Sequence, residues 1–558
     1  MAVKKISKKA SKKKVTKKKV SKVSSANAFS VNAVFGDDIN EDDIPDLIRP
    51  DLRAEARGEF RGDFTRDTFN PQDRFSRVLM QQGRVQLDAD WNEQNSIMLH
   101  HLRNLACDVG SQHWGPNLGA GFKIEMIDVD PGQTGLTISP GHYYVNGLLC
   151  EVGLDQNGDL HTYSNQADYP LPDGQSISDI DPNITAGVNS ALVYLDVWER
   201  HYTYINDDSM REVALAGPDT ATRAKIIWQV KILPIPFEGD TTGSVVPNHL
   251  KTNYRDFLEL IELVIKPGKG KLCAKLKDKA DDNDPCLVAP ESRYRGPENQ
   301  LYRVEIHQSG VAEGQMDDAN LLEPTPKATY KWSRENASVI FPIIAIQGSI
   351  ITLEHLGKDC RYGLERNNWV ELIDDDYVLQ CRADNLWKIE DIDEENRQVT
   401  LSNPSGASIE IDPSKHAYLR RWDHKDGKEN GIAVVENSDG ETWLEIEDGI
   451  QIQFKSSNDE SETDVITDAN GNVIGSLFAR YQTGDYWLIP ARTVTGDIEW
   501  PSVDGEPKAQ LPHGAVHHYA PLAILNKTGN SDTGGDVIDG SNQGENIDLR
   551  RIMIQTWT

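Results

Sequence analysis

Asn-Gly and Asp-Gly dipeptides recur along this chain between runs of β-branched and aromatic residues, and they constrain the fold more than any other feature. Asn-Gly occurs at 146–147, 157–158, 430–431 and 470–471, and Asp-Gly occurs, among other positions, at 173–174, 439–440, 448–449, 504–505 and 539–540. Both dipeptides supply the positive φ that a tight hairpin needs. A chain with so many hairpin signals is expected to fold mainly into antiparallel sheets.

The runs between these turns are typical of strands, because they are rich in β-branched and aromatic residues. They cover residues 136–152, 191–200, 224–233, 301–310, 338–356 and 368–379. A chain of 558 residues is too long for one core and suggests roughly three to four compact units. We therefore predict a mainly β, multidomain fold of antiparallel sandwich or barrel-like units, with an N-terminal arm and one amphipathic helix.

Changes in composition predict the domain boundaries. Residues 266–285 are polar and poor in aromatics, 456–464 form a charged stretch, and 528–548 are rich in Gly, Asn and Asp. The predicted organisation is a Lys-rich disordered tail (1–35), an arm and helix that form an assembly segment (36–120), a β domain (121–265), a linker or insertion (266–290), two further β domains (291–430 and 431–527) and a polar C-terminal extension (528–558).

Charge is distributed unevenly. The formal net charge is −30, and residues 1–25 contain 11 Lys and no acid, so the rest of the chain carries −41. The Lys-rich tail cannot bury apolar surface and lacks the apolar segment of a secretion signal. It is suited to contact an anionic membrane or acidic subunits, or it only solubilises the chain. The acidic remainder argues against a specific nucleic-acid ligand, which requires a basic surface.

One helix is predicted close to the N-terminus. Asp88 or Asp90 is suited to cap it, and Asp90 followed by Glu93 approximates a capping box. One face of this helix carries an apolar stripe at helical spacing, which is predicted to dock, while Glu93, His100 and Arg103 are expected to stay exposed to solvent. The docking stripe consists of Trp91, Met98, Leu102 and Leu105.

The arm that precedes this helix alternates Arg with Phe, two residue types that are enriched at protein interfaces. We predict that arm and helix together form an assembly interface, and the alternative is an arm that packs on its own domain. The predicted interface residues are Arg61, Arg66, Phe69, Phe75, Arg77, Arg84, Trp91, Met98 and Leu102.

No motif in the sequence indicates catalysis or a cofactor. Asp155, Asn157 and Asp159 begin like a calcium loop, but Leu160 stands where that loop needs Gly, so a hairpin turn is expected. A second stretch, from Asp468 to Asn472, fails in the same way. The run 374–376 of three Asp is expected to be an acidic hairpin turn.

The best metal candidates are His513, His517 and His518, because imidazoles are common ligands of zinc and iron. A turn leading into a strand around 521–525 is the favoured interpretation of this cluster. Six Cys without a CxxC pair predict neither a zinc ribbon nor a dense disulfide framework, which suits synthesis in a reducing cytoplasm.

Several ordered blocks give the chain a resemblance to a known group of proteins. They include FSRVLMQQGRVQLDADWNEQ (75–94), the block at 192–233, RYRGPENQLYRVEIH (293–307), YKWSRENASVIFPI (330–343), WVELIDDDYVL (369–379), the block at 481–501 and LPHGAVHHYAPLAIL (511–525). The blocks resemble a family of large bacterial structural proteins from phage-tail-like and extracellular contractile injection systems. The Lys-rich leader, the insertion at 266–286 and the C-terminal extension depart from this pattern.

The resemblance implies a non-enzymatic structural subunit, at the baseplate or associated with it. It implies partners among the baseplate, tube, sheath or spike proteins, copies of the chain within the assembly, and no cofactor. Synthesis in a bacterial cytoplasm is expected, within a particle that is released or membrane-associated. The alternatives are a terminal cap or adaptor of the same particle, a carbohydrate- or surface-binding fibre module that uses residues such as Trp487, and a hydrolase whose site is hidden in the fold.

Overall fold

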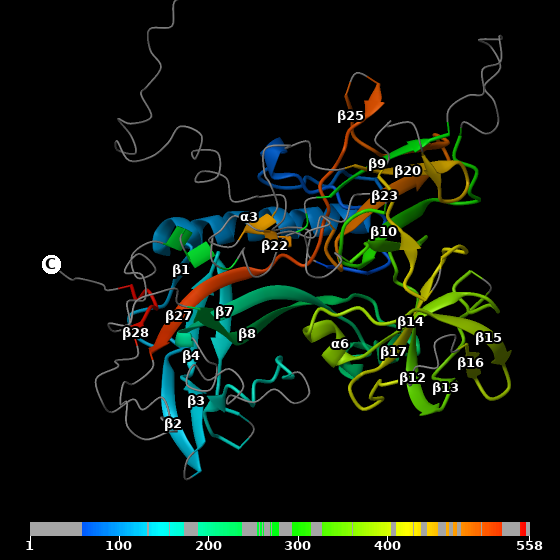
Figure 1. Cartoon of the computed structure of the whole chain (residues 1–558). Helices are drawn as coiled ribbons and strands as arrows, with labels where there is room; N and C mark the ends of the chain where they lie inside the picture. The colour runs from blue at the N-terminus through cyan, green and yellow to red at the C-terminus, as the bar shows by residue number, and fades with distance from the viewer. Residues whose placement is uncertain are drawn as a thin grey trace, which may run out of the picture. The chain divides into compact units, whose positions relative to one another are not determined.

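The computed structural model describes residues 59–130, 133–155, 157–171, 188–236, 254–255, 257–258, 261, 268, 270–277, 293–313, 326–359, 361–402, 409–427, 429–436, 443–455, 465–467, 473–476, 481–503, 505–526 and 547–553. The Lys-rich tail, the charged stretch at 456–464 and the second calcium-like stretch lie outside these residues, as does most of the C-terminal extension. The described fold is mainly β, as predicted, and its strands pair in antiparallel sheets (Figure 1).

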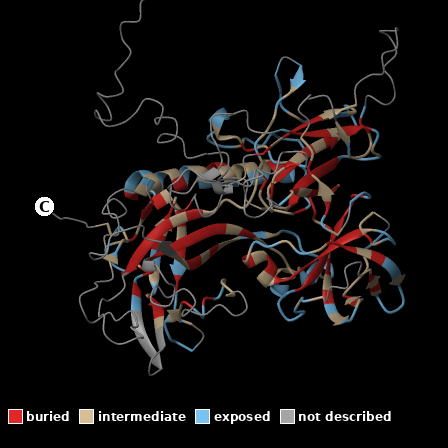
Figure 2. Cartoon of the chain, viewed as in Figure 1, coloured by how far each residue is buried: buried red, intermediate tan, exposed pale blue. Residues whose placement is uncertain are grey.

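The longest strands form a four-stranded sheet. Its order is β28 (Ile547–Asp548), β27 (His518–Asn526), β7 (Val188–Tyr202) and β8 (Arg223–Pro236). Successive side chains of a strand point to opposite faces. On β7, Val193, Leu195 and Val197 enter one core, and Leu192 and Tyr194 enter another. Both faces of β7 are therefore covered, which explains its continuous apolar sequence (Figure 2).

Two small sheets complete the first of these cores. One contains β1 (His113–Trp114), β4 (Gly141–Val145) and β5 (Leu148–Val152), and the other contains β2 (Ile124–Asp130), β3 (Gln133–Ile138) and β6 (His161–Thr162). Asn146 and Gly147 join β4 to β5 with φ of 45° and 78°. The Asn-Gly hairpin predicted here is confirmed, since both turn residues adopt the positive φ of a two-residue hairpin loop.

A second core lies between a five-stranded and a three-stranded sheet. The larger sheet orders β18 (Ile432–Ala433), β11 (Thr329–Ser333), β10 (Gln300–Gln308), β23 (Tyr486–Arg492) and β24 (Asp497–Ile498); the smaller orders β19 (Leu444–Glu445), β20 (Ile450–Lys455) and β9 (Lys271–Leu276). The segment 266–290, predicted as a linker or insertion, contains the strand β9, which pairs with β20. Leu272 and Ala274 are buried in the second core. The neighbouring Lys residues make the apolar pattern of this strand hard to recognise in the sequence.

The third core fills a closed six-stranded barrel. Its order is β12 (Ile340–Gln347), β13 (Ile350–Leu353), β16 (Gln398–Leu401), β15 (Trp387–Asp393), β14 (Trp369–Ile373) and β17 (Tyr418–Trp422). The apolar run 338–356 supplies two strands, because Gly348 turns the chain at a φ of 62°. Two isolated hairpins pair β21 (Val465–Thr467) with β22 (Val473–Ser476) and β25 (Ser502–Val503) with β26 (Glu506–Pro507).

Helical structure among the described residues is sparse. The long helix is α3 (Asp88–Gly110), and α6 (Asp375–Leu379) is short; three single turns are η2 (Pro71–Asp73), η3 (Asp208–Met210) and η4 (Val213–Leu215). The expected hairpin turn at 374–376 is wrong: Asp374 caps α6 by accepting a hydrogen bond from the Tyr377 N–H at 2.9 Å. Three acidic residues also favour the first turn of a helix, where the dipole stabilises negative charge.

The cores do not follow the predicted domain boundaries. The second core takes strands from the predicted linker and from both of the predicted domains 291–430 and 431–527. The barrel core, within residues 339–419, is inserted between strands of that sheet, and β27 returns to pair with β7. Among the described residues, no helix is both long enough and apolar enough to cross a bilayer.

Candidate functional site

The arm packs along one side of α3. The backbone N–H of Thr65 donates to Asp88 at 2.8 Å, and the Thr68 hydroxyl donates to Glu93 at 2.5 Å. The backbone N–H of Val78 donates to the Gln94 side chain at 2.8 Å. These bonds fix residues 65–78 against the helix, so arm and helix form one local unit.

The helix begins differently from the predicted cap. Leu87 is the N-cap residue, and Asp90 accepts a weak hydrogen bond from its N–H at 3.4 Å. Asp88 does not cap the helix through its side chain, because that carboxylate is bound to Thr65. Only the acidic half of a capping box is therefore present.

The inner face of α3 holds the helix on its own chain. Ala89 and Ile97 are each 2% exposed, and Arg103 forms a 2.9 Å ion pair with Glu199. The expectation that Arg103 stays in water is wrong, since its guanidinium reaches the end of β7. A Cβ at Gly147 would lie 2.5 Å from the Arg103 carbonyl oxygen, so the hairpin turn approaches the helix closely.

The outer face of α3 carries an apolar stripe that its own chain leaves exposed. Its members recur at spacings of seven, four, three and four residues, which places them on one side of an α-helix. They are Trp91 (72% exposed), Met98 (60%), Leu102 (61%), Leu105 (59%) and Val109 (61%). We call these five residues the outer stripe. Figure 2 shows exposed and half-buried positions along this helix.

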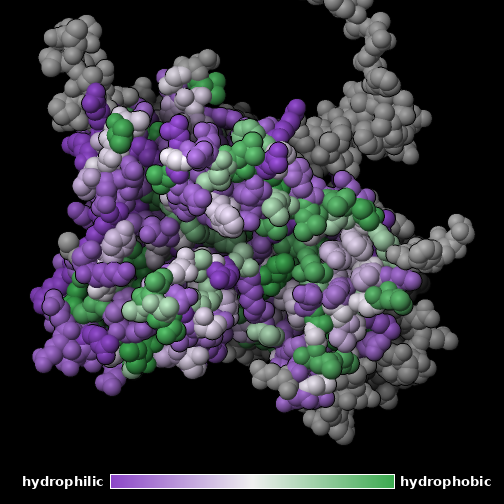
Figure 3. Space-filling view, turned by 180° about the vertical axis from the view of Figure 1, so that it is seen from behind, coloured by the Kyte–Doolittle hydropathy of each residue, from purple (hydrophilic) through white to green (hydrophobic). Residues whose placement is uncertain are grey.

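Exposed apolar residues continue from the outer stripe into the arm and the turn before α3. Phe75, Leu79, Met80 and Val85 are each at least half exposed. Seen from behind, Figure 3 shows hydrophobic patches on a surface that is otherwise mostly hydrophilic. Large apolar side chains gathered in one place typically mark an interaction surface.

The predicted interface residues divide into two groups. Arg61 and Phe69 face inward, and Arg66 forms a 3.2 Å ion pair with Glu499 of its own chain. These three belong to the packing of the arm on its own domain. The other predicted residues are exposed; they are Phe75, Arg77, Arg84, Trp91, Met98 and Leu102.

A small cavity lies where the arm crosses α3. It is lined by Phe69, Phe75, Ile97, Arg74 and His100, among others. The rings of Phe69 and His100 lie 5.8 Å apart. The lining is mixed, because Arg74, Glu93 and His100 contribute polar groups beside the rings of Phe69 and Phe75.

Arg61 anchors the arm in a buried network. Its guanidinium lies 3.1 Å from Glu305 on β10, which also accepts a 2.6 Å hydrogen bond from Arg303. Lys331 on β11 lies 3.4 Å from Glu305 and 2.7 Å from Glu371 on β14. The network therefore links the arm, the five-stranded sheet and the barrel.

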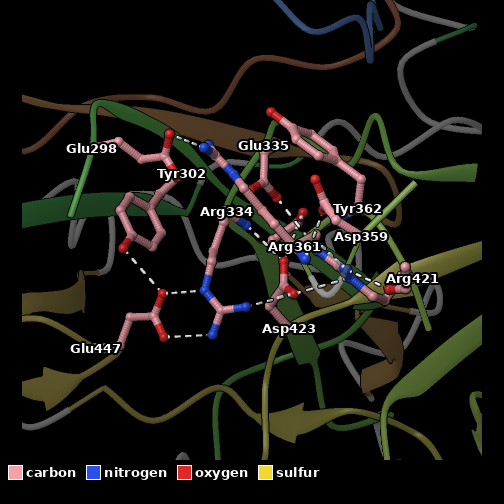
Figure 4. A network of polar contacts seen from close by, with 12 residues as sticks. Glu298, Tyr302, Arg334, Glu335, Asp359, Arg361, Tyr362, Arg421, Asp423 and Glu447 are labelled. Atoms are coloured by element: carbon pink, nitrogen blue, oxygen red, sulfur yellow. Dashed lines mark hydrogen bonds and ion pairs between the residues drawn. The ribbon is translucent and has the colours of Figure 1, made fainter. Parts of the chain in front are cut away.

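A second network joins the same sheet to the barrel through arginines (Figure 4). Arg334 binds Glu447 with two hydrogen bonds, of 2.5 and 2.7 Å, and donates to Asp423 at 3.0 Å. Arg361 donates to Glu335 at 3.1 Å. Paired guanidinium–carboxylate contacts of this kind fix orientation. We therefore interpret both networks as structural, because they hold the five-stranded sheet and the barrel together.

The three candidate metal ligands separate in the structure. His513 pairs through its backbone with Tyr486, and His518 accepts a 2.9 Å hydrogen bond from the Asn146 amide. His517 donates from Nδ1 to Asp196 at 2.7 Å. Across the described residues no group of His, Cys, Asp or Glu is arranged to hold a metal ion.

His517 instead belongs to a chain of polar groups that the sequence did not predict. Its Nε2 lies 3.9 Å from the sulfur of Cys381, which follows α6 and is exposed. The other oxygen of Asp196 accepts a 2.6 Å hydrogen bond from Lys231. Asp196, Cys381 and His517 are far apart in sequence, so no local spacing could have indicated them.

The structure places both Trp487, the candidate carbohydrate-binding residue, and the calcium-like stretch at 155–159. Trp487 is 1% exposed and its indole N–H donates to the Gln510 carbonyl at 3.0 Å, so it is not available to bind a carbohydrate. Asp155 closes a turn by accepting hydrogen bonds from the N–H groups of Asn157 and Asp159. A turn is present there, but the expectation of a hairpin turn is wrong, because the flanking strands β5 and β6 pair with β4 and β3 and not with each other.

Alanine at Phe69 is expected to destabilise the chain, whereas alanine at Phe75 is not. Phe69 is 4% exposed, and truncation of a buried Phe costs about 3 kcal/mol. Phe75 is 59% exposed, so its truncation should change stability by about 0.5 kcal/mol or less. Urea unfolding followed by circular dichroism measures both variants. Equal losses would contradict the placement of the two rings.

Comparison with known proteins identifies a family but no activity. We found no match to this chain among curated proteins or among solved structures. One family model matches residues 60–238 and 238–534, which is most of the chain. The chain is therefore a member of the family of unknown function DUF6519.

Proposed function

We propose that this protein is a structural subunit of a phage-tail-like or contractile injection particle, at or near the baseplate. The outer stripe of α3 carries the proposal. It is a stripe of exposed apolar side chains on a helix whose opposite face is already fixed to the chain. The resemblance of the sequence blocks to structural proteins of such particles supports the same role.

The chemistry of the outer stripe suits a subunit contact. Burial of each of its partly exposed side chains would stabilise a complex by roughly 1–2 kcal/mol. Trp and Met are enriched in the centres of interfaces, and Trp91 and Met98 lie on this stripe. Phe75 extends the apolar surface into the arm. A terminal cap or adaptor of the same particle would use this surface equally well.

Polar substitutions in the outer stripe should prevent incorporation without unfolding the chain. We expect the triple variant Trp91→Ser, Met98→Ser, Leu102→Ser to be lost from purified particles by at least tenfold. Its own core does not contain these side chains, so the circular dichroism and the urea midpoint should stay close to wild type.

The matched control changes exposed apolar residues elsewhere. Leu118, Val213 and Val494 are 88%, 86% and 95% exposed, and their triple Ser variant should assemble normally. Normal incorporation of the α3 variant would refute a role for the outer stripe. Loss of both variants would mean that exposed apolar residues act only through solubility.

A further inference from the structure

Three polar groups, Cys381, His517 and Asp196, have the arrangement of a thiol, an imidazole and a carboxylate that orients the imidazole. Asp196 lies on β7 and is 2% exposed, His517 directly precedes β27, and Cys381 lies two residues after the end of α6. The 2.7 Å bond to Asp196 uses the Nδ1–H of His517 and directs Nε2 toward the sulfur, 3.9 Å away. A hydrogen bond that fixes the tautomer and orientation of the ring is the third member of such a site.

Charge around the imidazole favours its protonated form. Burial disfavours a charged ring, but the ion pair and hydrogen bond with Asp196, together with the contact to Cys381, raise the pKa of His517 to about 10. Burial also opposes ionisation of Asp196, whereas His517 and Lys231 lower its pKa to about 2. Tyr194, Tyr519 and His518 are further titratable groups close to these residues. At neutral pH the sulfur therefore faces an imidazolium.

Aromatic rings hold that imidazolium in place. The ring of Trp198 lies 4.6 Å from the His517 ring, and Tyr519 stacks at 6.2 Å. Cys381 is exposed, while Cys150 and Cys273 are buried. A cation fixed beside an accessible sulfur is the environment in which cysteines react as nucleophiles.

We propose that Cys381, His517 and Asp196 form a nucleophilic thiol site that exchanges with small disulfides. The thiolate of Cys381 attacks one sulfur of the disulfide, a new S–S bond forms, and the old S–S bond breaks. The leaving thiolate takes a proton from Nε2 of His517. One disulfide replaces another, so no further oxidant or reductant is needed. Asp196 acts as a positioning residue.

Backbone geometry favours a disulfide over an acyl substrate. Acyl transfer needs N–H donors aimed at a developing oxyanion. The N–H of Cys381 donates to Val378 at 3.2 Å, and the N–H of Arg382 donates to Tyr377 at 3.3 Å. Both donors next to the sulfur are thus occupied by carbonyl groups. Disulfide exchange requires only a nucleophilic sulfur and an acid for the leaving group, and both are present.

Reaction of the full chain with oxidised glutathione tests the site. Peptide mass spectrometry follows the mixed disulfide at each cysteine separately, at pH 6.5 and at pH 8.5. At pH 6.5 we expect Cys381 to react at least tenfold faster in the wild type than in His517→Gln. The difference should narrow at pH 8.5, where an ordinary thiol titrates without help from a cation. Asp196→Asn should show the same pattern, more weakly.

Cys107 on α3 provides the internal control, because a variant that unfolds would react faster at Cys107 as well. Slower reaction at Cys381 with unchanged reaction at Cys107 supports the site. Equal rates at Cys381 in the wild type and His517→Gln at pH 6.5 would overturn it. So would a difference between the two proteins that does not depend on pH. The result is independent of the outer stripe, which none of these variants alters.

Discussion

Replacement of Lys331 by Met should lower the free energy of unfolding by about 3–5 kcal/mol, the usual cost of removing one member of a buried ion pair. Lys331 is 3% exposed and lies between Glu305 and Glu371. Burial would raise the pKa of Glu371, but Lys331, His307 and Arg420 act together against it, Lys331 most strongly, and lower that pKa to about 2. Without the ammonium, Glu371 would keep its bonds from Tyr377 and Trp422 but lose its nearest cation.

Lys225→Met is the matched control, because it breaks a Lys–Asp pair of similar length. Lys225 lies 2.8 Å from Asp168, and its side chain is 41% exposed. Partly exposed pairs of this kind contribute about 1 kcal/mol or less. Urea unfolding at pH 7 measures both variants. Equal shifts of the two midpoints would contradict the structural role of the buried network.

Acid should destabilise the chain between about pH 6.5 and pH 4. Five histidines are shielded from water, and burial is the main cause that lowers the pKa of each. The pKa is lowered to about 4 in His113, His307 and His518, and to about 3 in His201 and His424. Below pH 6.5 the unfolded chain binds protons that the folded chain does not.

The direction and the size of the change in stability with pH follow from this difference in bound protons. A depressed folded pKa contributes stability that is present above the unfolded value of 6.5 and is lost as the pH falls toward the folded value. Each histidine removes up to about 1.4 kcal/mol per pH unit in this window. Urea midpoints at pH 7.5, 6.5, 5.5 and 4.5 should therefore fall steeply below pH 6.5. A constant midpoint down to pH 4.5 would contradict the burial of these rings.

Local signals in the sequence predicted much of the secondary structure. The strands at 191–200 and 224–233 are present as β7 and β8, because β-branched runs suit a sheet that is covered on both faces. The hairpins at Asn146-Gly147 and Asp448-Gly449 are present as well, with positive φ at all four residues. In contrast, β9 was missed, because its Lys residues made the segment appear to be a polar linker.

Long-range pairing could not be predicted in this way. Strand β10 pairs with β11, close in sequence, and with β23, which lies almost 200 residues further along the chain. Local patterns determine which residues form a strand, whereas the pairing of strands depends on which apolar faces pack together in the folded chain. For the same reason the predicted boundaries at 290 and 430 do not separate the cores.

The candidate sites were predictable to different degrees. Spacing alone placed Trp91, Met98 and Leu102 on one face of a helix, but it could not show that Ala89 and Ile97 hold the opposite face to the chain. The contact between Asp196, His517 and Cys381 forms only when β7, β27 and the end of α6 come together in the fold. The imidazole that looked like a metal candidate is instead bound to a carboxylate.

Site-specific photo-crosslinking in assembled particles tests the subunit role most directly. A benzophenone side chain at position 98, in the outer stripe, is compared with the same group at position 118, which is also highly exposed. The proposed role predicts that position 98 crosslinks to a neighbouring subunit in high yield and position 118 does not. Crosslinks from position 98 that stay within its own chain, in particles that contain the protein, would contradict it.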